Sequence, residues 1–142
     1  RNATGWDAPV HLGDRINGKR LAKFVSPQTK RIAGAELGAV ALAAATSMAS
    51  GLPFVIVRNQ KKDYGTLKLV EGKIEKGDRV LLVEDVTTTG GSALKAAKAL
   101  ADEGAAIVRV LTIVDRLDGA AEAFRDAGLN FVPILTLNDF RS

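Results

Sequence analysis

Two adjacent carboxylates followed by a run of hydroxyl and glycine residues form the part of this sequence best suited to chemistry. Glu84 and Asp85 follow the apolar run Val80–Val83, and Thr87–Ser92 (TTTGGS) comes next. If the apolar run is a strand and the last segment opens a helix, main-chain N–H groups and hydroxyls at this turn form a cradle for an anion. Phosphate is the natural guest, whereas the two carboxylates suit ribose hydroxyls or a bound Mg²⁺ on the same ligand.

The same turn has a plain structural interpretation, in which Thr and Ser cap the helix and Glu84 and Asp85 are solvated at the strand end.

Other classes of functional site have less support in the sequence. The sequence contains no GxxxxGK[ST] loop and no GxGxxG turn after a strand, which argues against the common ATPase and dinucleotide-binding loops. It has no cysteine and one histidine, His11, so thiol nucleophiles, Cys-ligated metals and multi-His metal sites are excluded.

Four segments carry a family resemblance. Val80–Ser92 (VLLVEDVTTTGGS) resembles the phosphoribosyl-diphosphate (PRPP) signature of type I phosphoribosyltransferases, although that pattern usually has an aliphatic residue where Thr87 stands. Arg58–Gly65 (RNQKKDYG) is similar to the mobile catalytic loop of the orotate phosphoribosyltransferases. Ile32–Leu42 resembles the pyrophosphate-side loop of that family, and Asp115–Arg116 resembles the strand end whose arginine contacts the orotate carboxylate.

The resemblance implies a site in which these segments bind two substrates. The implied catalytic residues are Lys62, Arg58 and Asp85. The implied PRPP-binding residues are Arg58, Lys61, Lys62, Tyr64, Glu84, Asp85, Val86, Thr87, Thr88, Thr89, Gly90, Gly91 and Ser92. The pyrophosphate loop is expected at Ala35, Glu36, Leu37 and Gly38, and the orotate contacts at Thr88 and Arg116. No direct protein ligand to a metal is implied, because Mg²⁺ enters the site with PRPP.

The activity that the resemblance implies is transfer of the phosphoribosyl group of PRPP to orotate, giving orotidine 5′-phosphate and pyrophosphate in cytoplasmic pyrimidine biosynthesis. Members of the family are usually homodimers whose loop reaches the neighbouring site, so Arg58 or Lys62 is expected to act in trans. Two alternatives stay open. One is a phosphoribosyltransferase for another nucleobase, and the other is a non-catalytic regulator that binds PRPP.

Membranes and nucleic acids are not expected partners. The longest nearly uncharged stretch, residues 37–58, is broken by glycine, proline and hydroxyl residues well before about 20 apolar residues. The basic residues concentrate in the first third of the chain, where residues 1–34 carry seven basic and two acidic side chains. No basic run is interleaved with aromatic residues, as single-stranded nucleic-acid sites require.

The elements that must position these residues follow from the apolar pattern of the 142-residue chain. Strands are expected over residues 31–33, 53–57, 80–83, 107–114 and 131–135, and helices over 19–25, 37–50, 93–103 and 118–127. Continuous apolar strands that alternate with helices imply an α/β fold, a predominantly parallel sheet with helices on both faces. This matches the type I phosphoribosyltransferase fold. Ligands bind such sheets beyond the carboxyl ends of the strands, where the segments above lie.

Two parts of the chain depart from this regular alternation. The polar, glycine-punctuated segment 58–79 is expected to be a functional loop or lid. Residues 1–30 are expected to form a short N-terminal hood, and residues 31–142 the phosphoribosyltransferase core. The family normally has a longer hood with a lysine that helps to hold orotate, and Lys19 and Lys23 are the candidates for that lysine.

Overall fold

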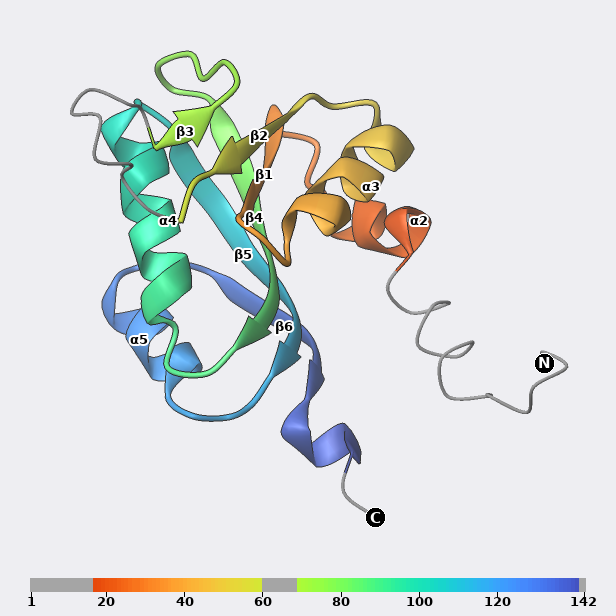
Figure 1. Ribbon diagram of the computed structural model, residues 1–142, viewed down its shortest axis with the longest axis vertical. Coiled ribbons are helices and arrows are strands. Elements are labelled where there is room, and N and C mark those ends of the chain that lie inside the picture. Colours follow the sequence, from red (N-terminus) through yellow and green to blue (C-terminus); the bar gives the residue numbers. More distant parts are fainter. Residues whose placement is uncertain (1–16, 60–68, 141–142) are drawn as a thin grey trace, which may run out of the picture.

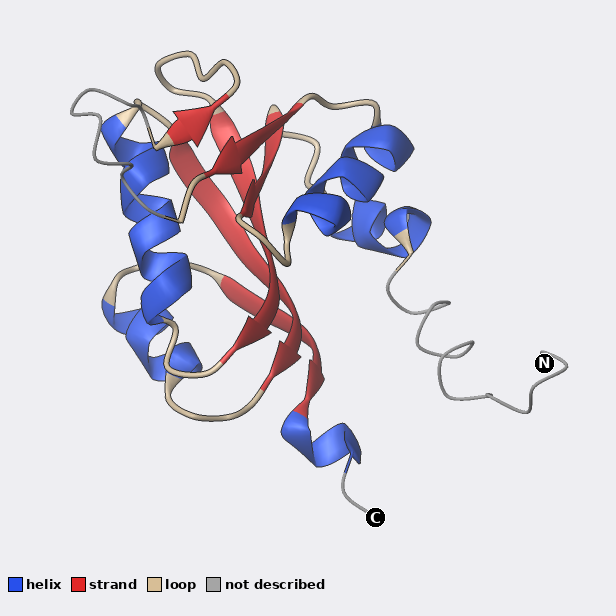
Figure 2. Cartoon of the chain, viewed as in Figure 1, coloured by secondary structure: helices blue, strands red, loops and turns tan. Residues whose placement is uncertain are grey.

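The computed structural model describes residues 17–59 and 69–140, and its centre is a sheet of six strands (Figures 1 and 2). The strands are β1 (Arg31–Ala35), β2 (Phe54–Val57), β3 (Val70–Glu71), β4 (Arg79–Thr87), β5 (Ala106–Asp115) and β6 (Phe131–Thr136). They lie in the order β3-β2-β1-β4-β5-β6, and every neighbouring pair is parallel except β2 with β3. The predicted, predominantly parallel sheet is therefore confirmed.

Helices cover both faces of this sheet, as predicted. One face carries α2 (Gly18–Leu21), the 3-10 turn η1 (Ala22–Phe24) and α3 (Val40–Ser50), and the other carries α4 (Gly91–Asp102) and α5 (Ala120–Asp126) (Figure 1). The turn η2 (Leu137–Phe140) follows β6. In β4, Leu81 and Val83 pack on the α3 side, while Val80 and Leu82 pack on the α4 side. Both faces of the strand are buried, which explains why its sequence is continuously apolar rather than alternating.

Helix α3 begins at Val40, three residues later than predicted, because residues 36–39 form a turn between β1 and the helix. The peptide bond between Glu36 and Leu37 in this turn is cis. The C-terminal end of α3 was predicted correctly. Gly51, with a φ of 78°, closes the helix in the left-handed conformation that glycine adopts most easily.

Strand β4 is longer than the predicted run 80–83, and Glu84 and Asp85 lie within it rather than after it. The reason is its partner: Glu84 pairs with Thr112, and Thr87 pairs with Asp115 at the end of β5. The prediction also missed β3, which pairs with β2 inside the segment expected to be a loop. Of that segment, residues 60–68 lie outside the described part of the chain.

Candidate active site

The two carboxylates near the end of β4 differ in their surroundings. Glu84 is only 6% exposed, and its Oε1 is buried without a hydrogen-bond partner among the described residues. Burial, together with the neighbouring Asp85 charge, raises the pKa of Glu84 to about 7. Asp85 is partly exposed, and its Oδ1 accepts a hydrogen bond from the Val86 N–H at 2.8 Å. One carboxyl group thus titrates near neutrality beside one that is open to a ligand.

The turn after β1 lies directly against this pair. A Cβ built on Gly38 would overlap the Asp85 carboxylate, with Cγ only 2.7 Å away. On the other side, the Glu36 N–H donates to the Val57 carbonyl of β2 at 2.8 Å. Leu37, between them, is 85% exposed. The segment predicted as the pyrophosphate loop, Ala35–Gly38, is therefore held between β2 and the carboxylates.

The hydroxyl and glycine residues after β4 form the N-terminal turn of α4. Gly90 is the N-cap, with a φ of 89°, and a Cβ there would lie 3.3 Å from the Ala120 Cα. Thr88, Thr89 and Ser92 are exposed at this turn, and the Gly91 N–H, the first of the helix, donates to the Thr89 Oγ1 at 3.4 Å. Such a helix end, with its positive dipole, suits a phosphate group.

Thr87 differs from the threonines that follow it. It is 3% exposed, and its Oγ1 donates to the Asp115 Oδ1 at 3.1 Å. Its hydroxyl is thus engaged within the protein, which leaves those of Thr88 and Ser92 for a ligand, together with the hydrogen of the Thr89 hydroxyl, whose oxygen accepts the Gly91 N–H at 3.4 Å.

Arg116 follows β5 and lies beside this turn. Its N–H donates to the Thr87 carbonyl at 2.9 Å, and its side chain is exposed. The next residue, Leu117, has a φ of 61° and donates its N–H to the Asp115 Oδ1 at 3.2 Å. The main chain therefore places the predicted orotate-binding arginine at the strand end next to the predicted phosphate site.

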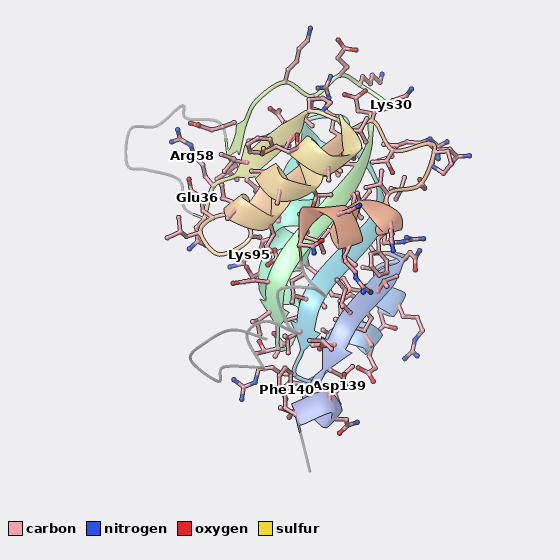
Figure 3. The ribbon with its side chains drawn as sticks, turned by 90° about the vertical axis from the view of Figure 1, so that its right-hand side faces the viewer. Lys30, Glu36, Arg58, Lys95, Asp139 and Phe140 are labelled. Carbon is pink, nitrogen blue, oxygen red and sulfur yellow. The ribbon has the colours of Figure 1, made fainter. Side chains whose placement is uncertain are left out.

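Arg58 lies at the end of β2 and forms an ion pair with Glu71 of β3. Its Nε is buried without a partner in the part of the chain that the structure describes, and its main-chain N–H donates to the Leu69 carbonyl at 2.6 Å. A cavity of about 370 Å³ separates Arg58 from Ser92 and Lys95 of α4. Figure 3 shows Arg58 and Lys95 on one side of the molecule, with Glu36 of the β1–α3 turn between their labels. The remaining predicted loop residues, Lys61, Lys62 and Tyr64, lie outside the described residues.

The structure thus brings together the carboxylates, the Ala35–Gly38 turn, the start of α4 and Arg116, with Arg58 at the margin. Sequence reasoning missed Lys95, although its spacing of three residues from Ser92 places both on one helix face. It also missed the Thr87–Asp115 hydrogen bond. The two residues are 28 positions apart, and the sequence signals the pair only through Asp115, which directly follows the predicted strand 107–114.

Glu84 and Asp85 are the acidic side chains that a metal at this site could use. Within residues 17–59 and 69–140 no group of three or more His, Cys, Asp or Glu side chains could hold an ion. Glu84 and Asp85 offer only two adjacent carboxylates, one of them with an unpartnered buried oxygen. Mg²⁺ is commonly bound by one or two carboxylates together with substrate phosphates. These residues therefore fit Mg²⁺ that arrives on a polyphosphate.

Within residues 17–59 and 69–140, no helix has the length and apolarity to cross a membrane.

Comparison with known proteins gives consistent matches. A family model described as the phosphoribosyl transferase domain matches residues 16–127. The orotate phosphoribosyltransferase of Methanothermobacter thermautotrophicus is 47% identical over 121 residues, which cover 85% of this chain and 67% of that protein. The orotate phosphoribosyltransferase of Methanocaldococcus jannaschii is 40% identical over 128 residues, which cover 90% of this chain and 73% of that protein. The chain thus spans 67% to 73% of the length of these two curated relatives.

Solved structures agree with these relatives. The orotate phosphoribosyltransferase of Mycobacterium tuberculosis H37Rv in complex with PRPP superposes with a TM-score of 0.74 at 38% identity, covering 87% of this chain and 73% of that one. The orotate phosphoribosyltransferase of Aeropyrum pernix superposes with a TM-score of 0.75 at 31% identity, and the match covers 97% of this chain and 75% of that one.

Proposed function

The chain belongs to the orotate phosphoribosyltransferase family, and from this premise we propose that it transfers the phosphoribosyl group of PRPP to orotate, yielding orotidine 5′-phosphate and pyrophosphate. One observation carries the proposal. The carboxylates Glu84 and Asp85 lie between the Gly38 turn and the start of α4, with Arg116 at the adjacent strand end. A sugar that carries a phosphate and a pyrophosphate matches this order of donors and acceptors.

The substrate groups are assigned to these parts by their chemistry. Carboxylates accept hydrogen bonds from hydroxyls, so Glu84 and Asp85 bind the ribose 2′- and 3′-hydroxyls. The Thr88–Ser92 turn, with Thr87 and Val86 supplying main chain only, binds the 5′-phosphate through N–H groups and hydroxyls. The Ala35–Gly38 turn, beside Asp85, binds the pyrophosphate on ribose C1.

The reaction breaks the bond between ribose C1 and the pyrophosphate oxygen and forms a bond from C1 to a ring nitrogen of orotate, which loses its proton. Positive charge develops on the sugar and negative charge on the leaving group. Such a displacement needs no protein nucleophile, so positioning and charge stabilisation supply the catalysis. Asp85, next to the sugar hydroxyls and the pyrophosphate turn, acts on the developing positive charge.

The cations assigned to the leaving group are Arg58 from the end of β2 and Lys61 and Lys62 from the sequence motif, together with Tyr64 as a PRPP contact. Mg²⁺, when bound with PRPP, neutralises pyrophosphate charge. Arg58 pairs with Glu71 in this structure, so it exchanges that carboxylate for the pyrophosphate when PRPP binds. Lys62 is the catalytic cation of the motif.

The base contacts are Arg116 and Thr88. A guanidinium binds a carboxylate through two parallel hydrogen bonds, and a carboxylate is what distinguishes orotate from uracil. The Arg116 side chain is exposed at the strand end beside the phosphate turn, and we place the acceptor base against it. The homodimer with a loop acting in trans, the N-terminal hood over residues 1–30 and the cytoplasmic location are further parts of the proposal, drawn from the family resemblance.

The decisive test is an acceptor assay. The protein is incubated with Mg²⁺ and PRPP and with orotate, uracil or hypoxanthine in parallel, and base consumption and pyrophosphate release are followed together. We expect stoichiometric loss of orotate and release of pyrophosphate, with no turnover of the other two bases. Preference for uracil or hypoxanthine would replace orotate with another base, and PRPP binding without turnover of any base would favour the non-catalytic regulator.

A further inference from the structure

Strands β4 and β5 are joined at their carboxyl ends by a buried side-chain hydrogen bond. The Thr87 Oγ1 donates to the Asp115 Oδ1 at 3.1 Å, and the two residues are paired in register. Thr87 is 3% exposed and Asp115 is 2% exposed, so neither side chain is available to a substrate. The function of this pair has to be exerted through the residues that follow it.

Those residues belong to two different subsites. Thr87 directly precedes the turn proposed to bind the 5′-phosphate, and Asp115 directly precedes Arg116. Two further hydrogen bonds lock the second subsite to the first: the Arg116 N–H donates to the Thr87 carbonyl at 2.9 Å, and the Leu117 N–H donates to the Asp115 Oδ1 at 3.2 Å. The main chain on both sides of Arg116 is therefore anchored to the Thr87–Asp115 pair.

The pair is well suited to fix a distance. A buried carboxylate is costly unless it is hydrogen-bonded, and Asp115 Oδ1 receives both the Thr87 hydroxyl and the Leu117 N–H. Leu117 adopts a φ of 61°, which an L-residue takes only when its surroundings impose it. Loss of the Thr87 hydroxyl removes one donor from a buried acceptor and one of the links between the strand ends.

We propose that Thr87 and Asp115 are positioning residues that set the separation between the phosphate turn and Arg116, and thereby align the acceptor base with ribose C1. This inference rests on the proposed function, because it needs the two substrates to occupy these two strand ends. Transfer reactions depend steeply on such alignment, since a shift of about 1 Å in a reacting group costs up to about a hundredfold in rate. The groups assigned to PRPP lie at the end of β4, at the start of α4, in the β1–α3 turn and on the Arg58 side, and none of them lies on β5. PRPP affinity should therefore not depend on the link.

The test compares three threonine variants of the full chain. Thr87→Val removes the hydroxyl at nearly constant volume, and Thr87→Ser restores it. Thr112→Val is the matched control, because Thr112 is also buried in β5 but its hydroxyl lies 3.4 Å from the Val114 carbonyl of the same strand. Orotate kcat/KM is measured by steady-state kinetics, PRPP Kd by calorimetry, and folding by thermal unfolding.

We expect Thr87→Val to lower orotate kcat/KM about tenfold or more while PRPP Kd stays within about twofold of the wild type. Thr87→Ser should recover most of the lost efficiency, and Thr112→Val should retain it. Unchanged orotate efficiency in Thr87→Val overturns the proposal. So does an equal loss of PRPP affinity, or an equal effect of Thr112→Val, because either result indicates a general structural role.

A second variant covers the case in which Thr87→Val does not fold. Asp115→Asn keeps the shape of the side chain and weakens the acceptor, and it should lower orotate kcat/KM without changing PRPP Kd. An equal loss of PRPP affinity overturns the proposal.

The activity of the wild type separates this inference from the proposed function. If it prefers uracil or hypoxanthine, the orotate assignment fails, and the same variants test alignment with that base. If it transfers to no base, both proposals fail.

Discussion

Gly38 and Asp85 are in direct contact although 47 residues separate them in the sequence. The space that a Gly38 side chain would occupy is already filled by the Asp85 carboxylate. The β1–α3 turn therefore packs directly against the carboxylate that the end of β4 presents. A ligand that spans both, such as a ribose carrying a pyrophosphate, meets the turn and the carboxylate as one surface.

The first prediction concerns this contact. Gly38→Ala should displace the Asp85 carboxylate and raise the PRPP Kd about fivefold or more, since overpacking of this kind costs about 1–3 kcal/mol. The measurement is calorimetric titration with Mg²⁺ and PRPP. Gly51→Ala is the control: open space surrounds Gly51, but its φ is 78°, so this variant should lose about 1–2 kcal/mol of folding stability and keep its PRPP affinity. Unchanged PRPP affinity in Gly38→Ala would remove the turn from the binding site.

The second prediction concerns pH and Glu84. Burial raises the pKa of this carboxyl from 4.5 to about 7, so the folded state retains a proton that the unfolded state releases. Its stabilising contribution is complete below pH 4.5 and is lost as the pH rises through about 7, a change of roughly 3 kcal/mol. The stability of Glu84→Gln relative to the wild type should therefore increase between pH 4.5 and 7.5 in denaturant unfolding.

The same titration should appear in ligand binding. Ribose hydroxyls donate to an ionised carboxylate, so wild-type PRPP affinity should rise between pH 6 and 8, after correction for the ionisation of PRPP itself. Glu84→Gln should flatten this rise, whereas Glu103→Gln, which changes an exposed carboxylate at the end of α4, should leave it intact. A profile that is the same in the wild type and Glu84→Gln would show that Glu84 does not titrate in this range.

The parts of the fold that the sequence predicted correctly are those fixed by burial. Val80–Val83 is apolar and Ile107–Val114 is largely so because both faces of the sheet are covered, and that pattern is visible without the structure. The predicted strand bounds are wrong where pairing with a neighbouring strand determines them. Glu84 and Asp85 look like residues beyond a strand end, yet the length of β5 extends the strand through them. No local pattern encodes the length of a neighbouring strand.

The candidate site likewise has features that the local sequence indicates and features that depend on strand pairing. The place of the Thr88–Ser92 turn could be predicted, because glycines and hydroxyls after an apolar run favour a turn that opens a helix, and α4 does begin there. That this turn binds phosphate stays a prediction. The link from Thr87 to Asp115 and the ion pair from Arg58 to Glu71 could not be predicted, because each depends on the register of two strands. A polar residue at a strand end does not reveal whether it will face solvent or a neighbour.

The third prediction uses that ion pair. Glu71 competes with pyrophosphate for Arg58, so Glu71→Gln should lower the PRPP Kd about two- to fivefold, the value of a partly exposed ion pair. Glu75→Gln, which removes an exposed partner of Lys73, is the matched control and should leave the Kd unchanged. Calorimetry on both variants decides the matter. A weaker affinity in Glu71→Gln would mean that Glu71 orients Arg58 for binding and does not restrain it.

The fourth prediction tests the loop motif. Lys62→Ala should reduce kcat about a hundredfold while the PRPP Kd changes by no more than about threefold, because a cation that acts on the leaving group contributes mainly in the transition state. Single-turnover kinetics and PRPP titration separate the two effects. Lys73→Ala, an exposed lysine between β3 and β4, should match the wild type in both. If KM for PRPP rises with kcat unchanged, Lys62 is a ground-state binding residue.

The last prediction concerns Arg116 and the choice of base. If its guanidinium binds the orotate carboxylate, Arg116→Ala should lose about 2 kcal/mol or more in orotate kcat/KM, the value of a charged hydrogen-bonded contact. PRPP affinity should stay unchanged, because the phosphate turn belongs to the other strand end. Arg125→Ala, an exposed arginine on α5, controls for loss of surface charge. Paired orotate kinetics and PRPP titrations on the three proteins make the comparison. An Arg116→Ala enzyme that keeps its orotate efficiency would place the carboxylate elsewhere, whereas a parallel loss of PRPP affinity would show that Arg116 supports the phosphate turn and does not select the base.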